Sequence, residues 1–393
     1  MIFNIKKTYF NLFLFVYSVC LSFAFNDSAH NILLIIFMMM SILTLAVYRF
    51  FTRYDLQIML FIFCILTFPM LAHDNATRWS TVTYSILFCL SFLSFIRAYI
   101  SSSISPDDFI ITLQILIYSY FVVLFIQQVS VLAGVAPINL RNYDVYEPFK
   151  LNSLGAEPSW SGRIVALLFY CYLTVRETKL GRAYSLSKDV RQDKWIWLAF
   201  LWTMITMISG TAIVFLSIVF VKFARLKSIL IVIIIAMISL TTLESVKFEP
   251  YERAKNVLIA TISLDERKVI EADHSASFRV VPLMVLAKSV GVSKFEDYFG
   301  HGVDSISEDL EFNLGPKATS SSFFGVWYEY GFIAFIIFMV CSIRMTVNSI
   351  PSFIFWFFLV FMTGLNIQLP WLAMMCLYIC KDMEKKYKGK AIF

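Results

Sequence analysis

Long apolar runs follow one another along this chain, and most are long enough to cross a lipid bilayer. A spanning helix needs about 20 predominantly apolar residues at about 1.5 Å per residue. The pattern predicts an all-α polytopic membrane protein with about 12 transmembrane helices in a single integral membrane domain, residues 1–393. The runs lie near residues 8–25, 30–48, 55–72, 80–99, 109–133, 158–175, 195–209, 211–223, 228–244, 323–343, 350–365 and 367–380.

Composition excludes an ordinary soluble protein. The chain is 59% hydrophobic and only 15% charged, whereas soluble domains carry about 25% charged residues. The formal net charge of +6 is spread over short connections, so it does not indicate nucleic-acid binding. All seven cysteines fall inside apolar runs, which predicts packing residues and neither a disulfide framework nor a metal site.

The first 25 residues fit either a signal peptide or a first membrane helix, because two lysines precede an apolar stretch. That stretch extends over about 17 residues, enough to span a bilayer. We therefore expect an uncleaved first helix.

Positive charge predicts the orientation, because Lys and Arg collect in cytoplasmic connections. With the N-terminus in the cytoplasm, every second connection collects them, and the C-terminal tail carries five lysines. Both termini are therefore expected to be cytoplasmic. Two sizeable loops then lie outside, at about 134–157 and 245–322.

The few charges within the predicted spans lie near outer helix ends. Arg163 and Glu329 are the notable ones. A transporter usually carries ionisable or helix-breaking residues at mid-depth, where its substrate binds. Polar residues gathered at the outer surface favour an enzyme that handles a lipid-linked substrate in the outer leaflet.

The first outer loop combines aromatic residues with both signs of charge. Arg141, Tyr143 and Lys150 precede Glu157. This combination suits sugar rings and phosphates, and it equally suits an ordinary interfacial loop. Pro158 is expected to start the next helix and to leave Glu157 just outside it. Arg163, less than two turns further, can then reach back toward the polar zone or pair within the bundle.

The long loop predicts two helices, at 249–263 and 275–290, the second with Ser275 or Ser277 as its N-cap. Arg279 would lie in the first turn of that helix, where the helix dipole disfavours a cation. This placement hints at a functional role or at an ion pair with a nearby acidic residue. His301, between Gly300 and Gly302, lies in a flexible turn that could bring it to a ligand or leave it in solvent. Glu329 is either an interfacial anchor or the partner of a cation such as Arg163.

Four stretches resemble the O-antigen polymerases (Wzy) of bacterial surface polysaccharide assembly. "GAEPSWSG" resembles the family's Glu-Pro-Ser stretch, and "MISGTAIVFLSIVF" resembles its Ser-Gly-Thr turn between two short helices. "SFRVVPLMVLAKSVGVSKFEDYFGHGVDS" is similar to the loop segment with an Arg before a helix and a Gly-x-Gly turn, and "SSSFFGVWYEYGFIAFIIF" to the following helix. The family's loops carry an Arg and a Gly separated by ten residues. Here eleven separate Arg279 from Gly291, and thirteen separate Arg141 from Gly155.

The resemblance implies a fold like that of the C-type membrane glycosyltransferases, in the bacterial inner membrane with both loops periplasmic. The implied activity joins undecaprenyl-pyrophosphate-linked oligosaccharide repeat units, donor and acceptor, into O-antigen or a related surface polysaccharide. Arg279, with Arg163 or Arg141, would stabilise the departing pyrophosphate. Glu157 would orient an arginine or accept the proton of the acceptor hydroxyl, and His301 is the second candidate base. Lys150, Tyr143 and Glu329 are further candidate substrate-binding residues.

Neither a metal nor another cofactor is expected, because the sequence has no HExxH and no His/Cys cluster. Membrane lipids and a chain-length regulator are the other expected partners, and nucleic acid is not. Ligases of the same superfamily carry a His near the end of the long loop, where this chain reads "ATSSSFFGVW". That difference counts against the ligase alternative. The other alternative is a lipid-linked oligosaccharide flippase or transporter.

Overall fold

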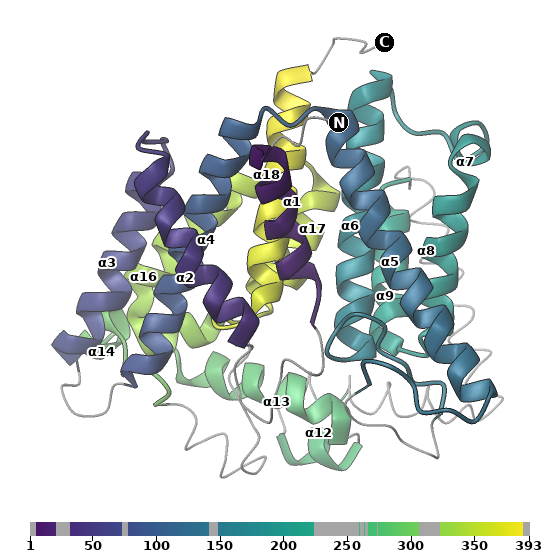
Figure 1. Cartoon of the computed structure of the whole chain (residues 1–393). Coiled ribbons are helices and arrows are strands. Elements are labelled where there is room, and N and C mark those ends of the chain that lie inside the picture. Colours follow the sequence, from purple (N-terminus) through teal and green to yellow (C-terminus); the bar gives the residue numbers. More distant parts are fainter. Residues whose placement is uncertain are drawn as a thin grey trace.

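The computed structural model describes residues 5–20, 32–72, 78–140, 148–223, 259, 263, 266–272, 274–305 and 323–387. All the regular secondary structure in this part of the chain is helical. Most helices run along one bundle (Figure 1). These are α1 (Ile5–Ser18), α2 (Ile32–Val47), α3 (Asp55–Ala72), α4 (Trp79–Ser102), α5 (Pro106–Leu132), α6 (Pro158–Leu180), α8 (Lys194–Thr206), α9 (Gly210–Val221), α16 (Phe323–Thr346), α17 (Ile350–Trp356) with its π-helical continuation η2 (Phe357–Phe361), and α18 (Gln368–Tyr387).

The two ends of the bundle differ. Helix α1 begins and α18 ends at one end, near the short helix α7 (Asp189–Gln192) (Figure 1). The short helices α12 (Glu266–Ala272), α13 (His274–Ser289) and α14 (Phe295–Phe299) gather at the opposite end. We call this opposite end the loop end.

The helices coincide with the apolar runs wherever the chain is described. Helix α3 has the predicted bounds of 55–72, and the run at 228–244 lies outside the described residues. Within the described ranges, three helices are long and apolar enough to cross a membrane, namely Trp79–Ser102, Pro106–Leu132 and Phe324–Thr346, and shorter apolar helices accompany them. The described part of the chain is therefore all helical and has helices suited to a membrane, and the total of 12 spans stays a prediction.

Local signals explain where two long helices begin. Ser105 caps α5 and accepts a hydrogen bond from the backbone N–H of Asp108, while Pro106 occupies the first helical position. This reciprocal capping box satisfies backbone donors that a helix start leaves unpaired. As predicted, Pro158 opens α6 and leaves Glu157 as its N-cap. Gly181, with φ 64°, ends that helix in the left-handed conformation that glycine favours.

The predictions for the long loop need one correction. Helix α13 begins at His274, so Ser275 and Ser277 lie inside it and neither is its N-cap. Arg279 is consequently the sixth residue of the helix and lies beyond the first turn in which it was predicted, and Pro282 lies in the helix interior. The helix predicted at 249–263 falls almost entirely outside the described residues.

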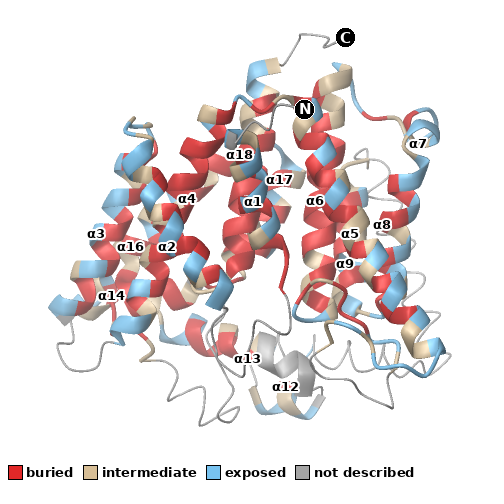
Figure 2. Ribbon diagram, in the orientation of Figure 1, coloured by how far each residue is buried: buried red, intermediate tan, exposed pale blue. Residues whose placement is uncertain are grey.

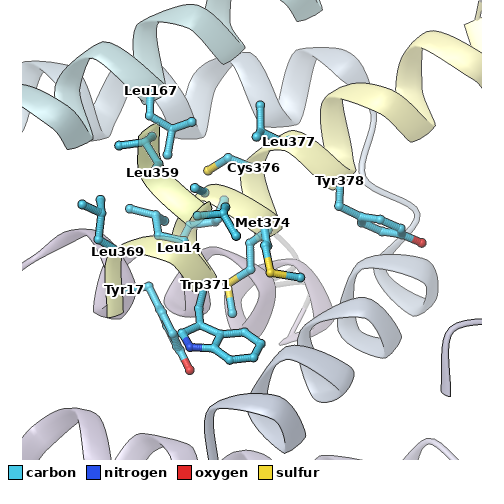
Figure 3. Close-up of a cluster of buried hydrophobic side chains, with 14 of the residues drawn as sticks. Leu14, Tyr17, Leu167, Leu359, Leu369, Trp371, Met374, Cys376, Leu377 and Tyr378 are labelled. Atoms are coloured by element: carbon cyan, nitrogen blue, oxygen red, sulfur yellow. The ribbon is translucent and has the colours of Figure 1, made fainter. Parts of the chain in front are cut away.

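The core extends through most helices of the bundle, and α18 packs against both α1 and α6 within it. Figure 2 shows buried residues along the inner helices and exposed ones on the outer faces. Figure 3 shows Leu14 and Tyr17 of α1, Leu167 of α6 and Trp371 of α18 packed together. Lipid tails are as apolar as these side chains, so close packing stabilises such a bundle more than hydrophobic burial does.

Small residues allow α6 and α9 to approach closely. A Cβ atom on Gly162 of α6 would lie only 2.7 Å from the Cβ of Ala212 in α9. Helix backbones in membranes approach closely where both sides are small. The "WSG" part of the Glu-Pro-Ser stretch therefore has a packing role that fixes the start of α6 against α9.

Candidate functional site

Helix α16 is broken near the loop end. Gly331 has non-helical dihedral angles of φ 85° and ψ 163°, which only glycine adopts at little cost. The turn at 300–305 docks on this break, and the backbone N–H of His301 donates a hydrogen bond to the carbonyl oxygen of Tyr328 at 2.8 Å. The Gly-x-Gly turn is thus bound to the membrane helix that follows it in the sequence.

Two glycines make this contact possible. A Cβ on Gly300, where φ is 95°, would lie 2.2 Å from the carbonyl oxygen of Glu329. A Cβ on Gly331 would lie 2.2 Å from the carbonyl oxygen of Tyr298. Two backbones therefore touch at a place where neither can carry a side chain.

Buried polar groups gather around the break. Glu329 is only 7% exposed, and its carboxyl group accepts a hydrogen bond from the backbone N–H of Asp304. The Asp304 carboxylate accepts a hydrogen bond from Thr81 Oγ1 of α4 at 2.8 Å. The Tyr330 side chain is buried beside Ser85 of α4. We call His301, Asp304, Glu329, Tyr330 and Thr81 the loop-end cluster.

His301 is the imidazole base of this cluster, and it is partly accessible. Its ring stacks on that of Tyr328 with a centroid distance of 4.4 Å, and a quarter of its side chain is exposed. Its Nε2 atom lies 3.5 Å from Oδ1 of Asp297 in α14. An imidazole that is stacked and placed beside a carboxylate is held in orientation, as a general base requires.

Asp297 remains ionised to perform this role. The backbone N–H groups of Lys294 and Ser293 donate to its Oδ2 atom at 2.9 and 2.8 Å. These hydrogen bonds, together with His301, hold the pKa of the Asp297 carboxyl below its ordinary value. A negative charge beside His301 is therefore present throughout the physiological pH range.

The helix that carries Arg279 packs beside this cluster. Val281 and Leu286 of α13 are buried in a small apolar group that includes Phe324 and Tyr328 of α16. Tyr328 in turn stacks on His301. The Arg279 side chain lies outside the described residues, but its backbone lies on the helix that contacts the histidine's neighbour.

Glu157 and Arg163 lie at the start of α6. Glu157 is exposed and accepts a hydrogen bond from Ser159 Oγ at 3.2 Å. The guanidinium of Arg163 is half-buried, lies 5.4 Å from the centroid of the Trp160 ring and donates from Nε to the Ser159 carbonyl oxygen at 3.2 Å. Both side chains therefore stay close to the helix mouth.

These two groups of residues come from different parts of the bundle. Helix α6 packs against α5, α8, α9 and α18, whereas α16 packs against α3, α13, α14, α17 and α18. Helix α18 is thus a shared neighbour of both, and so is α17, whose Phe355 stacks on Tyr170 of α6. Among the other predicted residues, Lys150 is exposed in the loop that precedes α6, and Arg141 and Tyr143 lie outside the described residues.

Sequence reasoning missed Asp297, Asp304 and Thr81. Asp304 follows the Gly-x-Gly turn and has a positive φ of 64°, a conformation that Asp tolerates in turns. The stretch "GHGVDS" therefore contained a signal for this residue, namely an Asp shortly after a Gly-x-Gly turn. Nothing in the sequence connects Thr81 to a residue 223 positions later, because only the folded bundle brings them together.

Among the described residues, no group of three or more His, Cys, Asp or Glu side chains is placed to hold a metal ion. No protein-family model, curated protein or solved structure matches the chain. The function must therefore be argued from the residues and their arrangement.

Proposed function

We propose that this protein is a membrane glycosyltransferase that polymerises undecaprenyl-pyrophosphate-linked oligosaccharide repeat units. It would act at the periplasmic face of the bacterial inner membrane, with both termini cytoplasmic and the loop end in the periplasm. The observation that carries the proposal is the loop-end cluster. It lies at the end of the bundle where α12, α13 and α14 gather, and α13 carries Arg279.

The location of charge supports an enzyme at the surface over a transporter. Besides the loop-end cluster, buried ion pairs join Asp55 to Arg97 and Arg176 to Asp193, each at 2.9 Å. Both of these pairs lie near the end where α1 begins and α18 ends (Figure 1). Transport at the bilayer midplane would instead favour ionisable groups at mid-depth.

The proposed reaction is a displacement at the anomeric carbon of the donor. A hydroxyl oxygen of the acceptor sugar forms the new C–O bond, and the bond to the pyrophosphate breaks. The electron pair of the broken bond leaves with the pyrophosphate, and a base takes the hydroxyl proton. Fixed cations close to the leaving oxygens lower this barrier, because they meet the charge as it develops.

The residues divide these roles as follows in the proposal. Arg279 stabilises the pyrophosphate, with Arg163 or Arg141 in support. His301, which Asp297 orients, and Glu157 are the two candidates for the base. Glu329 holds the turn that carries His301 through its hydrogen bond to the Asp304 backbone.

Deleting the gene tests the reaction class. We expect the deletion strain to display single repeat units on its lipid A, because the steps before and after polymerisation remain intact. Gel analysis of the lipopolysaccharide, with complementation by the wild-type gene, makes the measurement. Unattached polymer would point to a ligase, and complete loss of surface glycan would point to a flippase.

A further inference from the structure

The segment around α14 carries large apolar side chains on its surface. Phe295 is 59% exposed, Val292 is 49% exposed and Tyr298 is 38% exposed. They hold defined positions: the Phe295 ring packs 4.6 Å from that of Phe299, and the Tyr298 hydroxyl donates to the Val292 carbonyl oxygen at 2.8 Å. We call Val292, Phe295 and Tyr298 the α14 patch.

This patch continues two apolar helix faces. The Phe299 ring lies 5.0 Å from Phe68 near the end of α3, and the Tyr298 ring lies 6.5 Å from Phe332 of α16. Figure 1 shows α14 beside the ends of both helices. The outer faces of α3 and α16 expose Leu56, Met59, Leu60, Phe63, Leu66, Met70, Leu71, Ile336 and Val340.

The exposed apolar faces of α3 and α16 indicate that the α14 patch is next to lipid. The exposed residues of α3 recur every three or four positions, so they form one stripe along the helix. Helix α16 is long and apolar enough to cross a membrane. Stripes of this kind on a membrane bundle face lipid, and the patch extends them at the loop end.

We propose that the α14 patch lies in the bilayer itself, at the boundary between the lipid headgroups and the acyl chains. Aromatic side chains favour this depth, because their rings leave water while Tyr retains polar contacts. Lys294, exposed next to Phe295, supplies a cation for the lipid phosphates. The partner is a lipid surface, and the inference holds whatever reaction the protein catalyses.

The contact fixes how deep the loop-end cluster lies. Gly300 connects α14 to His301, and its backbone touches that of Glu329 in α16. A patch anchored in the headgroup region therefore holds His301 and Asp304 at the level of the lipid phosphates. A lipid-linked substrate presents its pyrophosphate at this level.

Depth-dependent fluorescence quenching tests the inference. The chain with Phe295→Cys is labelled with an environment-sensitive fluorophore and reconstituted in vesicles of phosphatidylethanolamine and phosphatidylglycerol. The seven native cysteines are buried, and unlabelled wild type measures any background. Ala287→Cys, exposed on α13, is the control in water, and Val292→Cys is a second site in the patch should Phe295→Cys fold poorly.

We expect lipids with a nitroxide on acyl carbon 5 to quench the patch labels at least about threefold more than the Ala287→Cys label, because the patch is at headgroup depth. Aqueous iodide should show the reverse order. If the patch labels are quenched by iodide as strongly as the control, the patch faces water and the inference is wrong. Protection from both quenchers would also overturn it, since a protein surface would then cover the patch.

Discussion

Replacing Gly331 by alanine is expected to abolish polymer formation and to destabilise the protein. The new Cβ would lie 2.2 Å from the Tyr298 carbonyl oxygen, and φ is 85° at this position. With ψ at 163°, this backbone conformation is essentially restricted to glycine, and holding another residue in it costs about 1–3 kcal/mol. The clash adds to this, because a Cβ atom is fixed to its own backbone and the atoms it meets are backbone atoms of Tyr298 and Phe299, so none can rotate away. The turn with His301 should therefore leave α16, which thermal unfolding of the purified protein and lipopolysaccharide gels would detect.

Gly134→Ala is the matched control for this substitution. Gly134 also has a positive φ, of 70°, but a Cβ there would meet nothing within 4 Å. It should lower the stability only by the backbone cost and leave the glycan ladder unchanged. Equal stability of the two variants, with a normal ladder from Gly331→Ala, would contradict the proposed docking of the turn.

Replacing Arg279 by alanine should remove most of the polymerase activity without unfolding the protein. Loss of one preorganised group that stabilises developing charge costs about 100- to 1,000-fold in rate. Arg279→Lys should restore only part of the activity, since lysine lacks the planar fork that matches phosphate. The ladder length in a complemented deletion strain, at wild-type protein levels, measures the effect.

Lys288→Ala is the control on the same helix. Lys288 forms a 2.8 Å ion pair with Glu266, and its side chain is 47% exposed, so its loss should cost little. Glu157→Ala, tested in parallel, shows whether the start of α6 contributes to the same reaction. Normal ladders from both Arg279→Ala and Glu157→Ala would refute the catalytic roles proposed for them.

Local sequence signals predicted the helices well. Apolar runs identified α3 and the other described helices of the bundle, because 18 or so apolar residues have few alternatives in lipid. Pro158 predicted the start of α6, since proline fits the first helical position and hardly any later one. Such features depend on neighbours in the sequence.

The candidate site depends on distant contacts, and the sequence predicted less of it. "YEYGF" lies within an apolar run and reads as continuous helix, whereas the contact with Gly300 allows the break at Gly331. The hydrogen bond from the Asp304 backbone to Glu329 was not predicted, and the role of Glu329 as an anchor or as the partner of a cation stays a prediction. The hydrophobic pattern of α16 contains no information about the turn at 300–305, which precedes the helix in the sequence and packs against it only in the folded chain.

The most direct test is polymerisation by the purified protein. The protein is reconstituted in vesicles with undecaprenyl-pyrophosphate-linked repeat units, a chelator of divalent metals and no nucleotide sugar. We predict a ladder of longer lipid-linked chains together with released undecaprenyl pyrophosphate, because the energy of the reaction resides in the lipid pyrophosphate. Unchanged repeat units, in vesicles where the protein is folded, would contradict the proposal that this chain is a polymerase.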